Sequence, residues 1–124
     1  MWAVQNGAYV TSVEPAQHML EISKLKNQIS KCEFICSKAE EIATHLNQKY
    51  DIIFLFGDVL SYVDEPTKVL SNLKDLSKRG TLIFGTVDNF YAYLRDVIIY
   101  DTKADYEYFK KFRKLPVESE HGFF

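Results

Sequence analysis

Short apolar runs alternate along the chain with stretches in which apolar residues recur every three or four positions. The runs are rich in β-branched and aromatic residues and predict strands, whereas the longer spacing predicts amphipathic helices. Strands are expected at residues 9–13, 33–36, 51–56 and 81–87, and helices at about 15–29, 39–46, 64–79 and 88–98. Single helices between successive strands predict an α/β fold, with a mostly parallel sheet and helices on both of its faces.

The third run, DIIFLF at residues 51–56, is apolar on both faces after its first residue. This pattern predicts a central parallel strand that helices cover on each side. Asp64, Glu65 and Pro66 should open the next helix, with acids and a proline at its positive end, and Gly80 should form its C-cap. Its buried stripe is expected to contain Val69, Leu70, Leu73 and Leu76.

Beyond the fourth run, Asp88 is expected to cap a helix. The apolar stripe of that helix contains Phe90, Tyr91, Leu94, Val97 and Ile98. The tail at residues 101–124 includes YEYFKKFRKL, which mixes aromatic and basic residues as nucleic-acid binders do. An amphipathic helix with Tyr106, Phe109 and Phe112 inward is the favoured interpretation, because the whole chain is mildly acidic.

Composition narrows the class of protein. The chain has 124 residues, 47% of them hydrophobic, and a formal net charge of −2. One soluble domain fits these values, while a nucleic-acid or anionic-membrane binder would need a basic excess. No signal peptide is visible, and no stretch approaches the roughly 20 apolar residues of a membrane span. We therefore expect a cytoplasmic protein.

Two cysteines, Cys32 and Cys36, are too few for a disulfide framework. No further Cys or His lies near them in sequence to complete a tetrahedral zinc site. We expect no metal, and we expect both cysteines to be buried as small residues.

The residues that follow the strands carry the candidate chemistry, because ligands of open α/β sheets bind beyond the carboxyl ends of the strands. The first strand ends at Glu14, which either accepts bonds from both hydroxyls of a ribose or caps the helix behind it. After the third strand, Gly57 permits close approach of a ligand, and Asp58 and Tyr62 add polar groups. The alternative for that segment is an ordinary turn.

Taken in order, four segments resemble the class I S-adenosylmethionine-dependent methyltransferases of the small-molecule type, which have a Rossmann-like fold. The second strand of that family is similar to GAYVTSVEPAQHML, and its third strand to CEFICSKAEEI. The fourth and fifth strands are similar to YDIIFLFGDVLSYVDEP and LKDLSKRGTLIFGTVDN. The resemblance covers residues 7–89, so we expect a single partial methyltransferase domain over residues 1–124, with 7–89 as its matched core and 101–124 as a C-terminal segment.

The resemblance implies S-adenosylmethionine as the cofactor and assigns residues to it. Glu14, followed by Pro15, would bind the ribose hydroxyls, and Lys38 and Ala39 would flank adenine. Lys38 stands where the family usually has an acid. Phe56 and Gly57 would face the methionine part, and the candidates near the transferred methyl group are Asp58 and Tyr62.

In the family, the first strand and a glycine-rich loop precede the segment matched by Gly7, and here only six residues come before Gly7. We therefore expect both to be missing, and the five glycines form no G-x-G-x-x-G pattern. In the family the first strand lies between the second and the fourth. We therefore expect a fragment of a longer enzyme, a truncated product or half of a split one. The second and fourth strands would have unpaired edges, which would permit a homo-oligomer.

Three functions follow from these observations. The first is methyl transfer to a small-molecule acceptor, with neither nucleic acid nor membrane as a partner. The second is a non-catalytic remnant, or a subunit that complements or oligomerises through its strand edges. The third is a fragment of a nucleotide-dependent dehydrogenase, because Glu14 suits that ribose as well.

Overall fold

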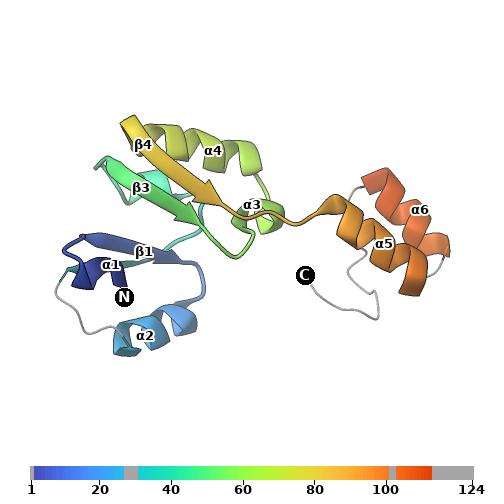
Figure 1. Cartoon of the computed structure of the whole chain (residues 1–124), viewed down its shortest axis with the longest axis horizontal. Coiled ribbons are helices and arrows are strands. Elements are labelled where there is room, and N and C mark those ends of the chain that lie inside the picture. Colours follow the sequence, from blue (N-terminus) through green and yellow to red (C-terminus); the bar gives the residue numbers. More distant parts are fainter. Residues whose placement is uncertain (1, 27–30, 101–102, 113–124) are drawn as a thin grey trace. The chain divides into compact units, whose positions relative to one another are not determined.

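A computed structural model describes residues 2–26, 31–100 and 103–112 (Figure 1). The elements are, in chain order, α1 (Trp2–Gln5), β1 (Val10–Glu14), α2 (Gln17–Lys26), β2 (Cys32–Cys36), the 3-10 helix η1 (Ile42–Thr44), β3 (Tyr50–Leu55), α3 (Val59–Tyr62), α4 (Pro66–Asp75), β4 (Ser77–Gly85), α5 (Phe90–Tyr100) and α6 (Lys103–Phe112). The chain forms two compact units, residues 1–85 and residues 86–124.

The strands of the first unit form two separate parallel pairs. β1 pairs with β2, from Val10 opposite Cys32 to Glu14 opposite Cys36. β3 pairs with β4, ending with Leu55 opposite Gly85. Among the described residues no ladder joins β1 to β3, so the predicted unpaired edges are confirmed. The alternation of parallel strands and helices confirms an incomplete, Rossmann-like α/β fold.

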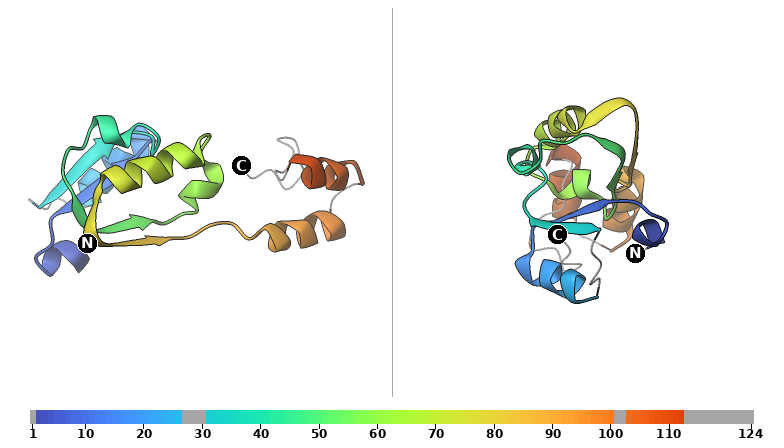
Figure 2. Two further views of the ribbon diagram at one scale, coloured as in Figure 1. Left: turned by 90° about the horizontal axis from the view of Figure 1, so that it is seen from above. Right: turned by 90° about the vertical axis from the view of Figure 1, so that its left-hand side faces the viewer.

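Helices cover the two pairs on opposite sides. Figure 2 shows α2 on one side of the strands and α4 on the other. Leu20 on α2 is buried, as are Val69 and Leu73 on α4. This placement of helices is the one expected of a doubly covered α/β sheet.

Two apolar clusters form the core of the first unit. In the first cluster, Leu55 of β3 packs with Val69 and Leu73 of α4. In the second, Ile42 and Leu46 near η1 pack with Leu76, at the end of α4. Partly buried residues from both strand pairs, Ile35, Tyr50 and Ile53, pack against this second cluster. It is therefore the apolar contact between the two halves of the unit.

The predicted helix at 39–46 is wrong, since only the 3-10 helix Ile42–Thr44 forms there. An α-helix would direct the carbonyls of Ala39 and Glu40 to amides four residues on. Here both carbonyls accept bonds from Nδ2 of Asn72, each 2.9 Å long. The apolar spacing still buries Ile42 and Leu46, so the pattern identified the buried residues but not the element.

The end of α4 also differs from the prediction. The Ser77 hydroxyl donates to the Leu73 carbonyl at 2.6 Å, and β4 begins at Ser77. Gly80 is therefore not a C-cap but lies within β4 with a φ of +92°, where the register against β3 shifts. Leu70, predicted in the buried stripe, is 52% exposed.

Within the described residues of the first unit, helices cover β3 on one face only, which corrects the expectation of helices on each side. Ile53 and Leu55 pack toward α4, whereas Ile52 and Phe54, with Phe56 just beyond the strand, are exposed. The alternation of a strand places these two sets on opposite faces.

The second unit contains α5 and α6. The Phe90 and Phe109 rings stack with centroids 5.0 Å apart, and Val97 and Phe109 are buried. The predicted amphipathic helix in the tail is thereby confirmed as far as Phe109, while the side chain of Phe112 and residues 113–124 lie outside the described residues.

The buried stripe predicted for α5 is partly wrong, because Tyr91 and Ile98 are exposed. Asn89, directly before the helix, makes a cap bond in which its Oδ1 accepts the Tyr91 amide at 2.9 Å. The prediction placed a cap one residue earlier, at Asp88. Asn is as good an N-cap as Asp, so the sequence offered two equivalent choices.

The cysteines are less buried than expected. Cys32 is half-buried and Cys36 is exposed, because β2 lies at the edge of a two-stranded sheet. In the described part of the chain, no helix has the length and apolar character to span a membrane.

Candidate functional site

Glu14 lies at the carboxyl end of β1, and its side chain caps the backbone that leads into α2. Its Oε1 accepts the backbone N–H of Ala16 at 3.0 Å, just before α2 begins at Gln17. The bond satisfies one of the amides that the first turn of a helix leaves without a partner. It occupies one carboxylate oxygen, and the carboxylate has a second.

The loop after β2 lies beside the loop after β1. Glu14 and Cys36 are opposite one another in the register, and the Cys36 thiol donates to the Pro15 carbonyl across 3.6 Å. Pro15 itself precedes α2 instead of forming its first turn. Two residues past Cys36, the Lys38 side chain is exposed. The structure thus brings Glu14, Pro15 and Lys38 to the same strand ends.

Ala39 has a different environment from Lys38. It packs against the cluster of Leu55, Val69 and Leu73 and is half-buried. The Ala39 methyl group thereby fixes the loop to the core, and of its two neighbours Lys38 is exposed and Glu40 is buried.

The loop after β3 begins with two exposed residues. The ring of Phe56 packs on that of Phe54, with centroids 5.0 Å apart. Gly57 has a φ of +81°, and a Cβ at this position would meet no atom within 4 Å. Positive φ is readily adopted by glycine, and the open space there leaves the backbone accessible.

Asp58 and Tyr62 frame the short helix α3. Asp58 precedes it with a left-handed φ of 55°, an uncommon conformation outside glycine that Asp tolerates better than most residues. Tyr62 is the last residue of α3 and is 48% exposed. These two residues and Gly57 follow β3, whereas Glu14 follows β1 in the other strand pair.

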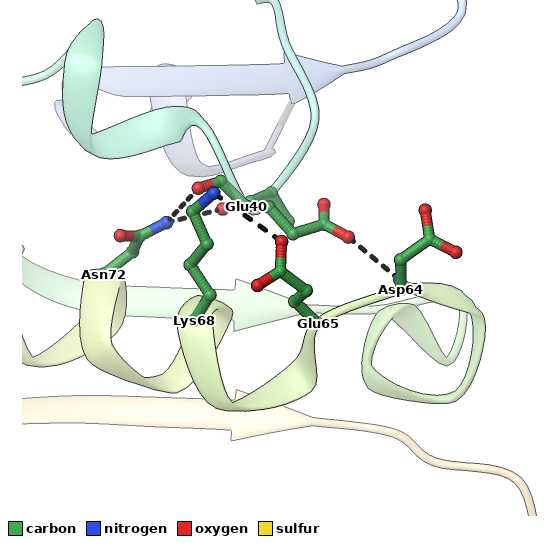
Figure 3. Close-up of polar contacts among 6 residues, drawn as sticks. Glu40, Asp64, Glu65, Lys68 and Asn72 are labelled. Carbon is green, nitrogen blue, oxygen red and sulfur yellow. Dashed lines mark hydrogen bonds and ion pairs between the residues drawn. The ribbon is translucent and has the colours of Figure 1, made fainter.

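Two buried polar residues connect the loops, and the sequence analysis missed both. Asn72 on α4 donates to the carbonyls of Ala39 and Glu40. Oε1 of Glu40 accepts the Asp64 amide at 3.0 Å (Figure 3). We call these three bonds the Glu40–Asn72 clamp. It ties the loop that carries Lys38 to the segment between α3 and α4.

One signal in the sequence could have revealed the clamp. Asn72 stands three residues after Val69 and one before Leu73, within the apolar stripe of α4. A polar residue in such a stripe must find partners, because burying an unpaired amide is costly. Glu40 had no comparable signal, since it fitted the polar side of a predicted helix.

Backbone amides around the Glu40 carboxylate, its own first among them, lower the pKa of this group. Hydrogen bonds from its own backbone amide, and from those of Asp64 and Glu65, lower the pKa of the Glu40 carboxyl from its ordinary 4.5. Burial opposes the shift, and the charge of Lys38 adds to it. The ionised form is the one that the amides stabilise.

Glu40 is expected to stabilise the fold in a pH-dependent way. Because its folded pKa is lowered, its contribution is fully present above pH 4.5 and is lost as the pH falls through the folded value. Thermal unfolding of the parent and of Glu40→Gln should therefore differ at pH 7 and converge below pH 4.5. A difference in melting temperature that stays constant down to pH 3 (roughly one unit below the ordinary pKa of a glutamate) would contradict this.

Other surface features do not form a site at these strand ends. A shallow depression lined by Glu33, His45, Leu46, Asn47 and Gln48 lies near the start of β2 and β3, at the amino ends of the strands. Within residues 2–26, 31–100 and 103–112, no group of three or more His, Cys, Asp and Glu side chains is placed to hold a metal ion.

Comparison with known protein families supports the arrangement of strand pairs and helices in the first unit. A family model described as a methyltransferase domain matches residues 1–84. No curated protein matches the chain. The match covers both strand pairs and the helices between them, and it ends one residue before the end of the first unit. The chain therefore belongs to the methyltransferase domain family.

Proposed function

We propose that this chain binds S-adenosylmethionine at the carboxyl ends of β1, β2 and β3, and that it takes part in transfer of the methyl group to a small-molecule acceptor. The observation that carries the proposal is Glu14, a carboxylate at the end of β1 with one oxygen engaged by the Ala16 amide. When bound, the cofactor supplies an electrophilic methyl group on a sulfonium sulfur.

The residues present fit parts of that cofactor. The carboxylate of Glu14 suits the two hydroxyls of a ribose, because it accepts bonds at both oxygens. Gly57 leaves space next to the backbone, with no atom within 4 Å of the position of a Cβ, so the methionine part can approach closely there. In this proposal, Lys38 and Ala39 flank the adenine, and Phe56 faces the methionine part.

The contribution of this chain to the reaction is alignment. Displacement at a sulfonium methyl needs little proton transfer, and positioning two reactants can contribute roughly 7–11 kcal/mol. Asp58, directly before α3, and Tyr62, its last residue, are the candidates that orient the acceptor. The Glu40–Asn72 clamp holds the adenine-side loop against the segment that follows α3.

Replacing Glu14 with glutamine tests the proposal. The amide oxygen of the introduced glutamine can still accept the Ala16 N–H, so the cap is retained, while the charged acceptor is lost. A hydrogen bond to a charged group contributes about 1.5–3 kcal/mol, so affinity for S-adenosylhomocysteine is expected to fall by about 10- to 100-fold. Isothermal titration calorimetry measures this.

The matched control is Glu107→Gln, which changes an exposed glutamate on α6, away from the strand-end loops in sequence, and should bind like the parent. Equal affinity of Glu14→Gln and the parent would remove Glu14 from the site. Failure of the parent to bind S-adenosylhomocysteine would refute cofactor binding by this chain. Binding of NAD in its place would favour the dehydrogenase alternative.

A second candidate function is a complementing or oligomerising subunit without activity of its own. The absence of a ladder between β1 and β3 in the described residues favours it, because unpaired strand edges invite another strand. It predicts no cofactor binding by the chain alone, which the same titration measures.

A further inference from the structure

The β3–β4 pair has an apolar face that no described helix of the first unit covers. The opposite face packs on α4 through Leu55, Val69 and Leu73. Five large side chains make up what we call the outer face. These are Ile52 (48% exposed), Phe54 (57%), Phe56 (61%), Leu82 (55%) and Phe84 (46%).

The outer face is continuous across the two strands. The register places Ile52 opposite Leu82 and Phe54 opposite Phe84. The Phe54 and Phe84 rings stack with centroids 5.5 Å apart, and Phe56 packs on Phe54 at 5.0 Å. These residues form one patch, whereas isolated apolar residues on a surface are common and carry no such meaning.

A parallel pair with one bare face departs from the usual physics of such sheets. Parallel sheets occur almost only where both faces are covered, and a two-stranded sheet alone is marginal in water. Burial of the outer face therefore requires a partner surface that is itself apolar.

We propose that the outer face is the contact between two copies of this chain, which associate as a two-fold symmetric dimer. Aromatic side chains bury about 150–250 Å² each, so at the observed exposures three phenylalanines and two aliphatic residues offer roughly 500 Å² of apolar surface. Two such faces bury roughly 1,000 Å² in total, which is about the lower limit of a specific interface.

Charge also favours a second copy as the occupant. None of the five outer-face residues is charged, and the adjacent Asp51 and Lys78 neutralise one another in a 2.6 Å ion pair. A two-fold axis brings each residue of a face close to the same face of the partner. Such a contact is free of like-charge repulsion here, and the net charge of −2 opposes it little.

Sedimentation equilibrium of the full chain, from micromolar to millimolar concentration, tests the proposal. The parent should change from monomer to dimer mass, with a dissociation constant on the order of micromolar or weaker for an interface of this size. Phe84→Asp should remain monomeric at every concentration, because a carboxylate would be buried in the contact.

Two further variants keep the test sharp. Ile52→Thr preserves strand propensity and should weaken the dimer at least 10-fold even if Phe84→Asp does not fold. Ile99→Asp changes an exposed apolar residue on α5 (58% exposed) and should dimerise like the parent. A parent that is monomeric throughout, association beyond the dimer, or equal loss of dimer in Ile99→Asp and Ile52→Thr would overturn the proposal.

Discussion

Replacing Asn72 with leucine is expected to lower the free energy of unfolding of the chain by about 2–5 kcal/mol. The volume of the side chain is nearly kept, but both of its bonds to the carbonyls of Ala39 and Glu40 are lost. Each buried carbonyl left without a partner costs about 1–3 kcal/mol. Chemical denaturation in urea, monitored by circular dichroism, gives the difference directly.

Asn47→Leu is the matched control for this experiment. Asn47 is exposed in the loop before β3, so the same substitution there should change the free energy of unfolding by no more than about 0.5 kcal/mol. If Asn72→Leu cost as little as this control, the clamp would contribute nothing to stability.

Truncation of Leu73 to alanine is expected to have an effect of similar size. Leu73 is 6% exposed and packs with Leu55 and Val69. Removing a buried leucine side chain costs about 2–5 kcal/mol, from lost burial and from the cavity left behind. The free energy of unfolding from urea denaturation again measures the change.

Leu70→Ala provides the comparison from the same helix. Leu70 is 52% exposed, so we expect a loss of less than about 1 kcal/mol. The pair of variants distinguishes the observed buried face of α4 from the stripe that apolar spacing predicts, in which both leucines are buried. Equal losses at the two positions would support the sequence pattern against the structure.

Much of the fold follows from the sequence because parallel strands are short, apolar and regularly separated. All four strands were predicted within a few residues, and so were α2, α4 and α5. The second edges of β1 and β3, which no strand of the described residues occupies, also followed from the missing first strand of the resembled family. Each of these predictions depends on local pattern or on order along the chain.

The errors come from contacts between residues far apart in sequence. The apolar spacing of residues 39–46 favours a helix, but Asn72, more than 25 residues later, takes the carbonyls that a helix would use. Ser77 ends α4 early through its bond to Leu73, which no spacing of apolar residues encodes. β3 has a bare face because no described helix of the first unit packs on it. The residue pattern of a single strand does not encode which elements pack against that strand.

The candidate site, like the fold, was predictable where it depends on local pattern and not where it depends on contacts between distant residues. The sequence identified the residues at the strand ends because such positions are defined by the strands themselves. It left open whether Glu14 is a cap or a ligand. The structure shows the cap with one oxygen, which leaves the ribose role as a proposal. Glu40 and Asn72 connect the loops, and their partners are visible only in three dimensions.

The division into two strand pairs has a consequence for cooperativity. Each pair is built from one contiguous segment, residues 10–36 and residues 50–85, so each can form without waiting for a distant strand. The bond from the Tyr50 hydroxyl to Oγ1 of Thr11, the packing of Ile35 on the Ile42 cluster and the clamp couple the two. Whether the first unit melts in one transition therefore depends on a few side chains that bridge the two strand pairs. In a continuous sheet, a ladder of backbone hydrogen bonds would couple them instead.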